Sequence, residues 1–339
     1  MKIHKLLPVA LLILGIGQST AEDNFNLKGN IQTQGSKSLS DDDNNLSSFW
    51  FRANIGGQYK SDNLDGQIMI RLFGPEFGNT IENKKYDKIL ADVYFANYKW
   101  NTDLRKLNLK LGHWKNNWSE SSFFGTYLDK NLTSRGLESR DQAVNGIELG
   151  YALGISKLNI MLGTTDNKWN TGYVRIEETL DFDLPLTLKL AYRGNLLDRI
   201  QNTSYTTHRM AFKGEYEFFK KFRAYGEIAY LYTQKDDDVN ENAENYVNTQ
   251  DSYLNPGKSY LPIYLGLEIP TPIFDQFFAE AEFIKDRDQL SSKESDADNL
   301  AWTLAFVKKI KNTKIQFGVY SEEKINNVGL ATRISTSFN

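Results

Sequence analysis

Arginine recurs on the polar side of seven alternating segments of this sequence. If the segments formed one sheet, these side chains would share a face. Fixed cationic groups attract anions and repel cations, most strongly in a throat of low dielectric. The seven are Arg52, Arg71, Arg175, Arg193, Arg209, Arg223 and Arg333. Pairing with acidic neighbours on the same face is an equally good interpretation of any one of them. The carboxylates available are Glu177, Glu215, Glu217, Glu227, Glu280 and Glu282.

Catalytic and ligand-binding motifs are weak by comparison. His113 and His208 are the histidines outside the N-terminal stretch, and no local signature joins either to a Ser or Asp partner. Pro256-Gly257-Lys258-Ser259 lacks the first glycine of a phosphate-binding loop, since Ser252 stands there. The acidic run at 41–45 lacks the glycine and the bidentate Glu of a calcium loop. We expect no enzyme activity, no catalytic residue, no metal and no cofactor.

The first residues are typical of an export signal. Lys2 and Lys5 precede an apolar run over 6–16, and the small residues at 19–21 suit a cleavage site. We expect residues 1–21 to be a signal peptide and the mature chain to begin at Glu22. The run is well short of the ~20 residues that a membrane-spanning helix needs, and no later segment is as long. These features argue against an inner-membrane protein.

The composition combines many aromatic residues with a hydrophilic average. The chain has 20 Phe, 18 Tyr and 6 Trp, yet its mean hydropathy is −0.51. It has no cysteine, which excludes a disulfide framework. Removal of Lys2 and Lys5 takes the formal net charge from −3 to −5, which argues against a nucleic-acid partner. A transmembrane barrel with aromatic residues outside and polar residues inside explains this combination.

The mature sequence alternates with a period of two in segments of about ten residues. In the segment 208–218, Phe212 and Tyr216 alternate with Lys213, Glu215 and Glu217, a face too charged for a dry core. We therefore predict an all-β fold over 22–339: a transmembrane antiparallel up-and-down β-barrel of about sixteen strands. A soluble β-sandwich or barrel is the alternative. The predicted strands are 25–34, 48–59, 64–73, 88–100, 105–114, 144–153, 156–164, 172–180, 186–194, 208–218, 222–233, 260–268, 276–285, 299–308, 313–321 and 327–338.

The connections differ in length in a regular way. Those after even-numbered strands are short, as at 60–63, 154–155 and 309–312, and most of the others are long and polar. Bacterial barrels have short periplasmic turns and long external loops, so this phase places both termini on the periplasmic side. Aromatic residues near strand ends suggest the girdles that mark the membrane interfaces. They are Trp100, Trp302, Tyr59, Tyr98, Tyr264 and Phe338.

Two stretches resemble the outer-membrane porin superfamily of Gram-negative bacteria. The last strand alternates from Val328 to an aromatic residue, Phe338, as in the signal that the barrel assembly machinery reads, although Asn339 follows it. The stretch from Gly112-His113-Trp114-Lys115 to Asn145-Gly146-Ile147-Glu148-Leu149-Gly150 is loosely similar to the phosphate-selective porin type. The resemblance implies an outer-membrane location, with lipid and lipopolysaccharide as neighbours and a homotrimer as a further expectation.

The resemblance to general porins also implies a role for the longest connection, 115–143, which is the third external loop. In that family this loop folds into the lumen and narrows the pore. Trp118, Phe123, Phe124 and Tyr127 would anchor it to the wall. The candidates for its charged lining are Glu120, Lys130, Arg135, Glu138, Arg140 and Asp141.

Three functional hypotheses follow. The first is a water-filled porin for passive diffusion of small hydrophilic solutes and ions. The second is a substrate-selective channel for phosphate or another anion, or for an oligosaccharide. The third is a plugged barrel whose loops bind a partner at the cell surface. Stable conductance would separate the first two from the third, and saturable conductance would favour the second.

Overall fold

The computed structural model describes residues 24–39, 48–73, 77–78, 89–102, 105–116, 118, 137, 143–164, 171–200, 203–205, 207–219, 222–233, 259–285, 300–322 and 324–338. The expected signal peptide, 1–21, lies outside these residues. Among the residues described, no helix is long and apolar enough to cross a membrane.

Sixteen long strands account for nearly all of the described chain, as the alternation predicts. Two short segments, β4 (Phe77–Gly78) and β11 (Thr203–Tyr205), extend the edges of neighbouring strands near their loops. The long strands are β1 (Phe25–Ser38), β2 (Ser48–Lys60), β3 (Leu64–Phe73), β5 (Ile89–Asn101), β6 (Arg105–Lys115), β7 (Ala143–Leu153), β8 (Ser156–Thr164), β9 (Thr171–Asp181), β10 (Leu186–Ile200), β12 (Thr207–Phe218), β13 (Phe222–Thr233), β14 (Ser259–Pro270), β15 (Gln276–Lys285), β16 (Leu300–Ile310), β17 (Thr313–Glu322) and β18 (Lys324–Phe338).

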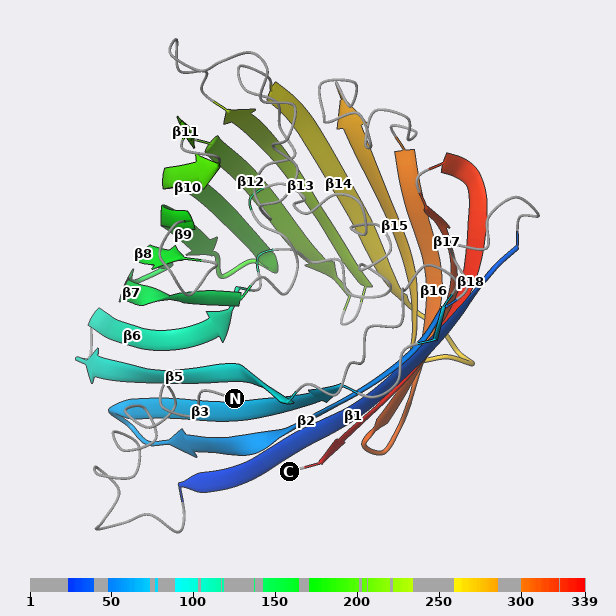
Figure 1. Cartoon of the computed structure of the whole chain (residues 1–339), viewed down its shortest axis with the longest axis horizontal. Helices are drawn as coiled ribbons and strands as arrows, with labels where there is room; N and C mark the ends of the chain where they lie inside the picture. Colours follow the sequence, from blue (N-terminus) through cyan, green and yellow to red (C-terminus); the bar gives the residue numbers. More distant parts are fainter. Residues whose placement is uncertain are drawn as a thin grey trace.

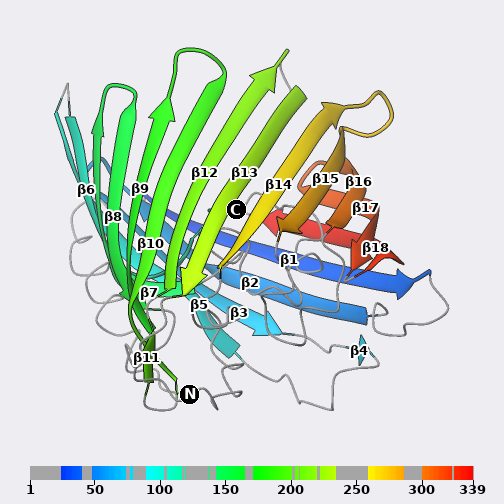
Figure 2. The ribbon, with the colours of Figure 1, turned by 90° about the horizontal axis from the view of Figure 1, so that it is seen from above.

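The strands form a closed antiparallel barrel. Each long strand pairs with its neighbours in chain order, and β1 closes the ring by pairing with β18 from Gly29↔Phe338 to Ser38↔Gly329. Figure 1 shows β1 beside β18 on one side of the ring, and Figure 2 shows the inclined strands from above. Closure gives each long strand that the structure describes a partner on both edges, which a lipid environment requires because it offers backbone groups no water.

The two faces of the wall differ as the alternation predicts. On β16 the exposed Leu304 alternates with the buried Thr303 and Ala305. Across the barrel, exposed apolar side chains such as Leu190 and Phe212 point outward, whereas charged residues on the same strands face the interior. An apolar exterior around a polar interior is the arrangement expected of a barrel in a membrane.

The short connections after β2, β5, β7, β9, β12, β14 and β16 lie at one end of the barrel, together with the start of β1 and the end of β18. We call it the turn end, and the opposite end the loop end. Tight turns require left-handed backbone at Gly154 (φ 57°), Lys311 (φ 51°) and Phe219 (φ 36°). Near the loop end, a β-bulge between Met69 and Ile70 shifts the register of β3 against β5. This shift brings Asp92 within 2.8 Å of Arg71.

Candidate functional site

The inner wall of β9, β10 and β12 carries a row of arginines. Arg193 is the direct cross-strand partner of Arg175 on one side and of Arg209 on the other. All three side chains are buried. Arg193 stacks its guanidinium 3.9 Å from the centre of the Tyr173 ring, and Arg175 contacts the carboxylate of Glu177. Three cationic groups on adjacent strands concentrate positive charge in one sector of the interior.

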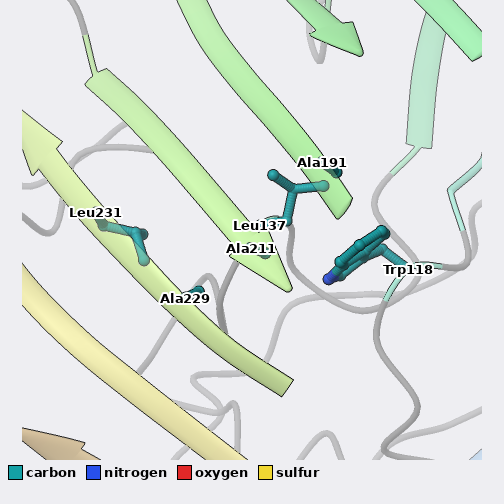
Figure 3. Packing of buried hydrophobic residues seen from close by; sticks show 6 residues of the cluster. All are labelled: Trp118, Leu137, Ala191, Ala211, Ala229 and Leu231. Carbon is teal, nitrogen blue, oxygen red and sulfur yellow. The ribbon is translucent and has the colours of Figure 1, made fainter. Parts of the chain in front are cut away.

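The next row toward the turn end is made of small residues. Ala191, Ala211 and Ala229 are direct partners across β10, β12 and β13. Two residues of the long connection 115–143, Trp118 and Leu137, pack onto these alanines in one buried cluster. Figure 3 shows the cluster, completed by Leu231. Methyl side chains leave room for a large aromatic ring to lie close to the wall.

A third row holds these two loop residues by polar contacts. Lys213 donates a hydrogen bond from Nζ to the carbonyl oxygen of Trp118 at 3.1 Å. The backbone amide of Leu137 donates to Glu227 Oε1 at 3.3 Å. The Trp118 ring centre also lies 5.7 Å from the Arg175 guanidinium and 6.0 Å from Lys213 Nζ. Apolar packing, charged hydrogen bonds and cation–π contacts therefore fix Trp118 and Leu137 against the basic wall.

A charge network continues from this site toward the turn end. Glu215 lies 3.1 Å from Lys213, 2.8 Å from Arg223 and 3.8 Å from Lys189. Arg223 also lies 3.6 Å from Glu268. One carboxylate thus joins cations from three strands, so Lys213 is held in place for its bond to Trp118.

The seven predicted arginines do not form one continuous ladder. Arg71 forms an ion pair with Asp92 near the loop end, and Arg223 belongs to the charge network around Glu215. Arg333 on β18 donates a hydrogen bond to Gln34 Oε1 at 2.7 Å. Arg52 is half-buried on β2. Of the seven, Arg175, Arg193 and Arg209 are direct cross-strand partners. The other interpretation, pairing with acidic neighbours in a polar interior, fits Arg71, Arg175 and Arg223.

Comparison with known proteins supports the architecture but not a closer relationship. No protein-family model matches this sequence, and no curated protein matches it. The outer-membrane channel DcaP of Acinetobacter baumannii aligns over 93% of this chain and 97% of its own, with a TM-score of 0.59 and 10% identity. OmpF of Salmonella typhi, solved with daunomycin, aligns over 93% and 98%, with a TM-score of 0.61 and 12% identity. OprB of Pseudomonas putida aligns over 94% and 96%, with a TM-score of 0.61 and 9% identity.

This chain has the porin fold. At such low identity the similarity concerns the fold, so residue roles must be argued from this chain alone. Within the porin fold, the expected anchor Trp118 is buried against the wall. The other expected loop residues lie outside the described residues. They are Glu120, Phe123, Phe124, Tyr127, Lys130, Arg135, Glu138, Arg140 and Asp141.

Both histidines hydrogen-bond to neutral side chains. His113 Nδ1 lies 3.0 Å from Asn145 Oδ1, and His208 Nδ1 lies 2.8 Å from the Tyr192 hydroxyl. Within the described ranges, no group of three His, Cys, Asp or Glu side chains is placed to hold a metal ion.

One sequence expectation about the girdle is wrong. Tyr264 faces the interior and is buried, opposite Glu227 and Glu282 on the neighbouring strands. The reason is the phase of β14, in which Leu265 and Leu267 are exposed and point outward. The alternation of Leu265 and Leu267 was the sequence signal for this phase, because two leucines at this spacing mark the outward face of the strand.

The residues that sequence reasoning missed are those that seat the loop. The alternating pattern points to neither the alanine row nor Leu137, and it marks Lys213 only as part of a charged face. Lys110 is a further inward cation that was missed; its Nζ lies 4.5 Å from the Trp114 ring centre and 4.7 Å from that of Phe95. Small residues at matching inward positions of three consecutive strands were a usable signal for a wall that something approaches closely.

Proposed function

We propose that this protein is an outer-membrane channel for passive diffusion of small hydrophilic solutes and ions. The observation that carries the proposal is the closed sixteen-strand ring with an apolar outer face and a charged inner face. A barrel of this strand number is wide enough to leave an aqueous passage, whereas an eight-stranded barrel is filled by its own side chains. The named channels that share the fold support the same function.

We place the constriction at the connection 115–143. Trp118 and Leu137, one near each end of this connection, lie against the inner wall, which supports a loop folded across the barrel interior. In that arrangement Glu120, Lys130, Arg135, Glu138, Arg140 and Asp141 would provide fixed charge opposite the arginine row. Fixed charge in a narrow, low-dielectric passage selects ions by sign.

An anion-selective channel is the second candidate. The observation that favours it is the register of Arg175, Arg193 and Arg209 on three adjacent strands. Because all three are buried, their field rather than direct contact would act on a passing ion. The sign of the selectivity then depends on the loop charges as well.

Single-channel conductance of the refolded protein in planar bilayers tests the function. Under a salt gradient we expect stable open steps, with a reversal potential that shifts toward cation preference in Arg135→Ala and Arg140→Ala. Protein that is folded by circular dichroism but gives no conductance would instead indicate a plugged barrel. Conductance that saturates with phosphate or with an oligosaccharide would favour a substrate-selective channel.

A cross-linking experiment tests the placement of the loop separately. The chain has no cysteine, so Leu137→Cys with Ala229→Cys introduces a single pair within the buried cluster. We expect a short bifunctional reagent to join them in the membrane-inserted protein. The matched control pairs Leu137→Cys with Ala331→Cys, which lies in a different inner-wall cluster on β18. Equal yields from the two pairs would contradict an ordered loop on the alanine row.

The remaining expectations stay predictions. They are contact with lipopolysaccharide, recognition of the last strand by the assembly machinery through Phe338, assembly into a homotrimer, and removal of residues 1–21.

A further inference from the structure

Apolar side chains are exposed on five successive short connections at the turn end. Each of these connections, from the one between β7 and β8 to the one between β16 and β17, presents at least one aliphatic or aromatic residue in the turn or, for Ile310, at the end of the preceding strand. They are Ile155 at 45%, Leu184 at 67%, Phe219 at 95%, Ile273 at 77% and Ile310 at 54% exposed. Such a regular row on consecutive turns is unusual for a rim that faces only water.

On β12 the apolar outer wall continues into the turn that carries Phe219. On β12 the outward side chains Met210, Phe212, Tyr216 and Phe218 are all exposed, and Phe219 follows them in the turn. Tyr216 and Phe218 pack edge to face with ring centres 4.2 Å apart. The outer wall and this turn therefore form one apolar surface.

Aromatic packing supports two of these turns from the adjacent strands. The ring centres of Phe218 and Phe222, on either side of the β12–β13 turn, lie 5.4 Å apart. In the next turn, the ring centre of Phe274 lies 4.9 Å from the ring centre of Phe306 on β16. The left-handed backbone at Phe219 holds a bulky residue in a conformation that such residues rarely adopt. An exposed aromatic residue in such a turn would be stabilised by contact with an apolar phase outside the barrel.

The turn residues that the structure describes on the opposite side of the same rim are polar. The β2–β3 turn consists of Ser61, Asp62 and Asn63, and the β5–β6 turn begins with Thr102. On that side the exposed aromatic residue Trp100 lies within the strand, before the turn. The apolar surface thus ends inside the strands on one side of the barrel and includes the turns on the other.

We infer that the turn end between β7 and β17 is immersed in the membrane interface, while the β2–β6 side of the rim projects into water. The occupant of the apolar row is the headgroup and upper acyl region of the lipid leaflet at that end. Continuity with the outer wall favours lipid over a protein partner, because aromatic and aliphatic side chains at this depth are the usual boundary of a membrane-embedded barrel. The inference rests on the proposed membrane location but not on conductance.

Site-directed spin labelling tests this inference in the reconstituted full-length protein. Nitroxides are placed singly at Ile273→Cys in the apolar row, at Asp62→Cys in the polar turn and at Met210→Cys on the outer wall. Collision rates are measured with oxygen, which concentrates in lipid, and with a water-soluble nickel chelate. We expect the collision rate with oxygen to exceed that with the nickel chelate at positions 273 and 210. We expect the reverse at position 62.

The outcomes distinguish the immersed rim from the membrane location on which it rests. Nickel dominance at 273 with oxygen dominance at 210 would overturn the immersed rim and leave the membrane location intact; the row would then be open to a periplasmic protein. Nickel dominance at 210 as well would overturn the membrane location itself. A further variant, Phe219→Ser with the label at 273, is expected to lower the oxygen collision rate. Oxygen dominance at both 273 and 62 would also overturn the asymmetry.

Discussion

Arg193 on β10 and Arg209 on β12 stand directly opposite each other in the register of their strands. Two like charges in direct cross-strand positions are unfavourable unless other groups compensate. The Tyr173 ring stacks against Arg193, and the Glu177 carboxylate contacts Arg175 in the same row. These contacts offset part of the repulsion between cations that lie beside the seat of Trp118.

The arginine row of the inner wall should contribute to the ion selectivity of the channel. We expect Arg209→Gln to shift the permeability ratio toward cations, by roughly twofold, because one buried positive charge is removed from the inner wall. Reversal potential under a potassium chloride gradient measures this shift. Arg333→Gln is the matched control, since Arg333 lies on β18 outside the row and binds Gln34. Equal shifts in both variants would contradict a special role for the row.

The alanine row should be sensitive to added volume. Ala211→Leu would place a branched side chain where Trp118 and Leu137 pack, so we expect the loop to be displaced and the single-channel conductance to change. Overpacking of this kind costs about 1–3 kcal/mol. Ala53→Leu adds the same volume to the half-buried outer side of β2 and should leave conductance unchanged. If the two variants conduct alike, the loop does not depend on this wall.

The interior also contains a buried hydrogen bond whose loss can be measured as stability. The Tyr225 hydroxyl donates to Glu280 Oε1 at 2.9 Å, and both side chains are buried. Tyr225→Phe leaves the carboxylate oxygen without this donor, which should lower the free energy of unfolding by about 1–3 kcal/mol. Urea unfolding in lipid vesicles provides the measurement. Tyr230→Phe, on the exposed outer face, should have a much smaller effect.

Two glycines should respond oppositely to the same substitution. A Cβ added at Gly56 would lie 1.9 Å from the backbone oxygen of Ile68, whereas at Gly35 the nearest atom, in the Phe49 ring, is 3.9 Å away. Gly56→Ala therefore forces β2 away from β3 and should reduce the yield of folded barrel, at a cost of about 1–3 kcal/mol or more. Gly35→Ala should be neutral or slightly stabilising, because alanine loses less backbone entropy on folding. Folded yield by gel mobility without heating compares the two.

Strand number, strand faces and the end of the barrel that carries the short turns could be predicted from the sequence. These features are local: a period of two assigns each residue to a face, and a short polar segment between two such strands forms a turn. The predicted and observed strands agree closely, and the outward Phe212 and inward Lys213 are as expected. The misplaced Tyr264 shows that even a local prediction fails when a strand end is judged by residue type rather than by its face.

Only the tertiary structure decided which inward residues meet. The register that aligns Arg175, Arg193 and Arg209 and stacks three alanines beneath them depends on how each hairpin is offset from the next around a closed ring. A one-residue offset anywhere would pair different side chains, and sequence patterns do not fix such offsets. The contact of Trp118 with Lys213 joins residues far apart in the chain, so it follows from barrel closure and not from any local preference.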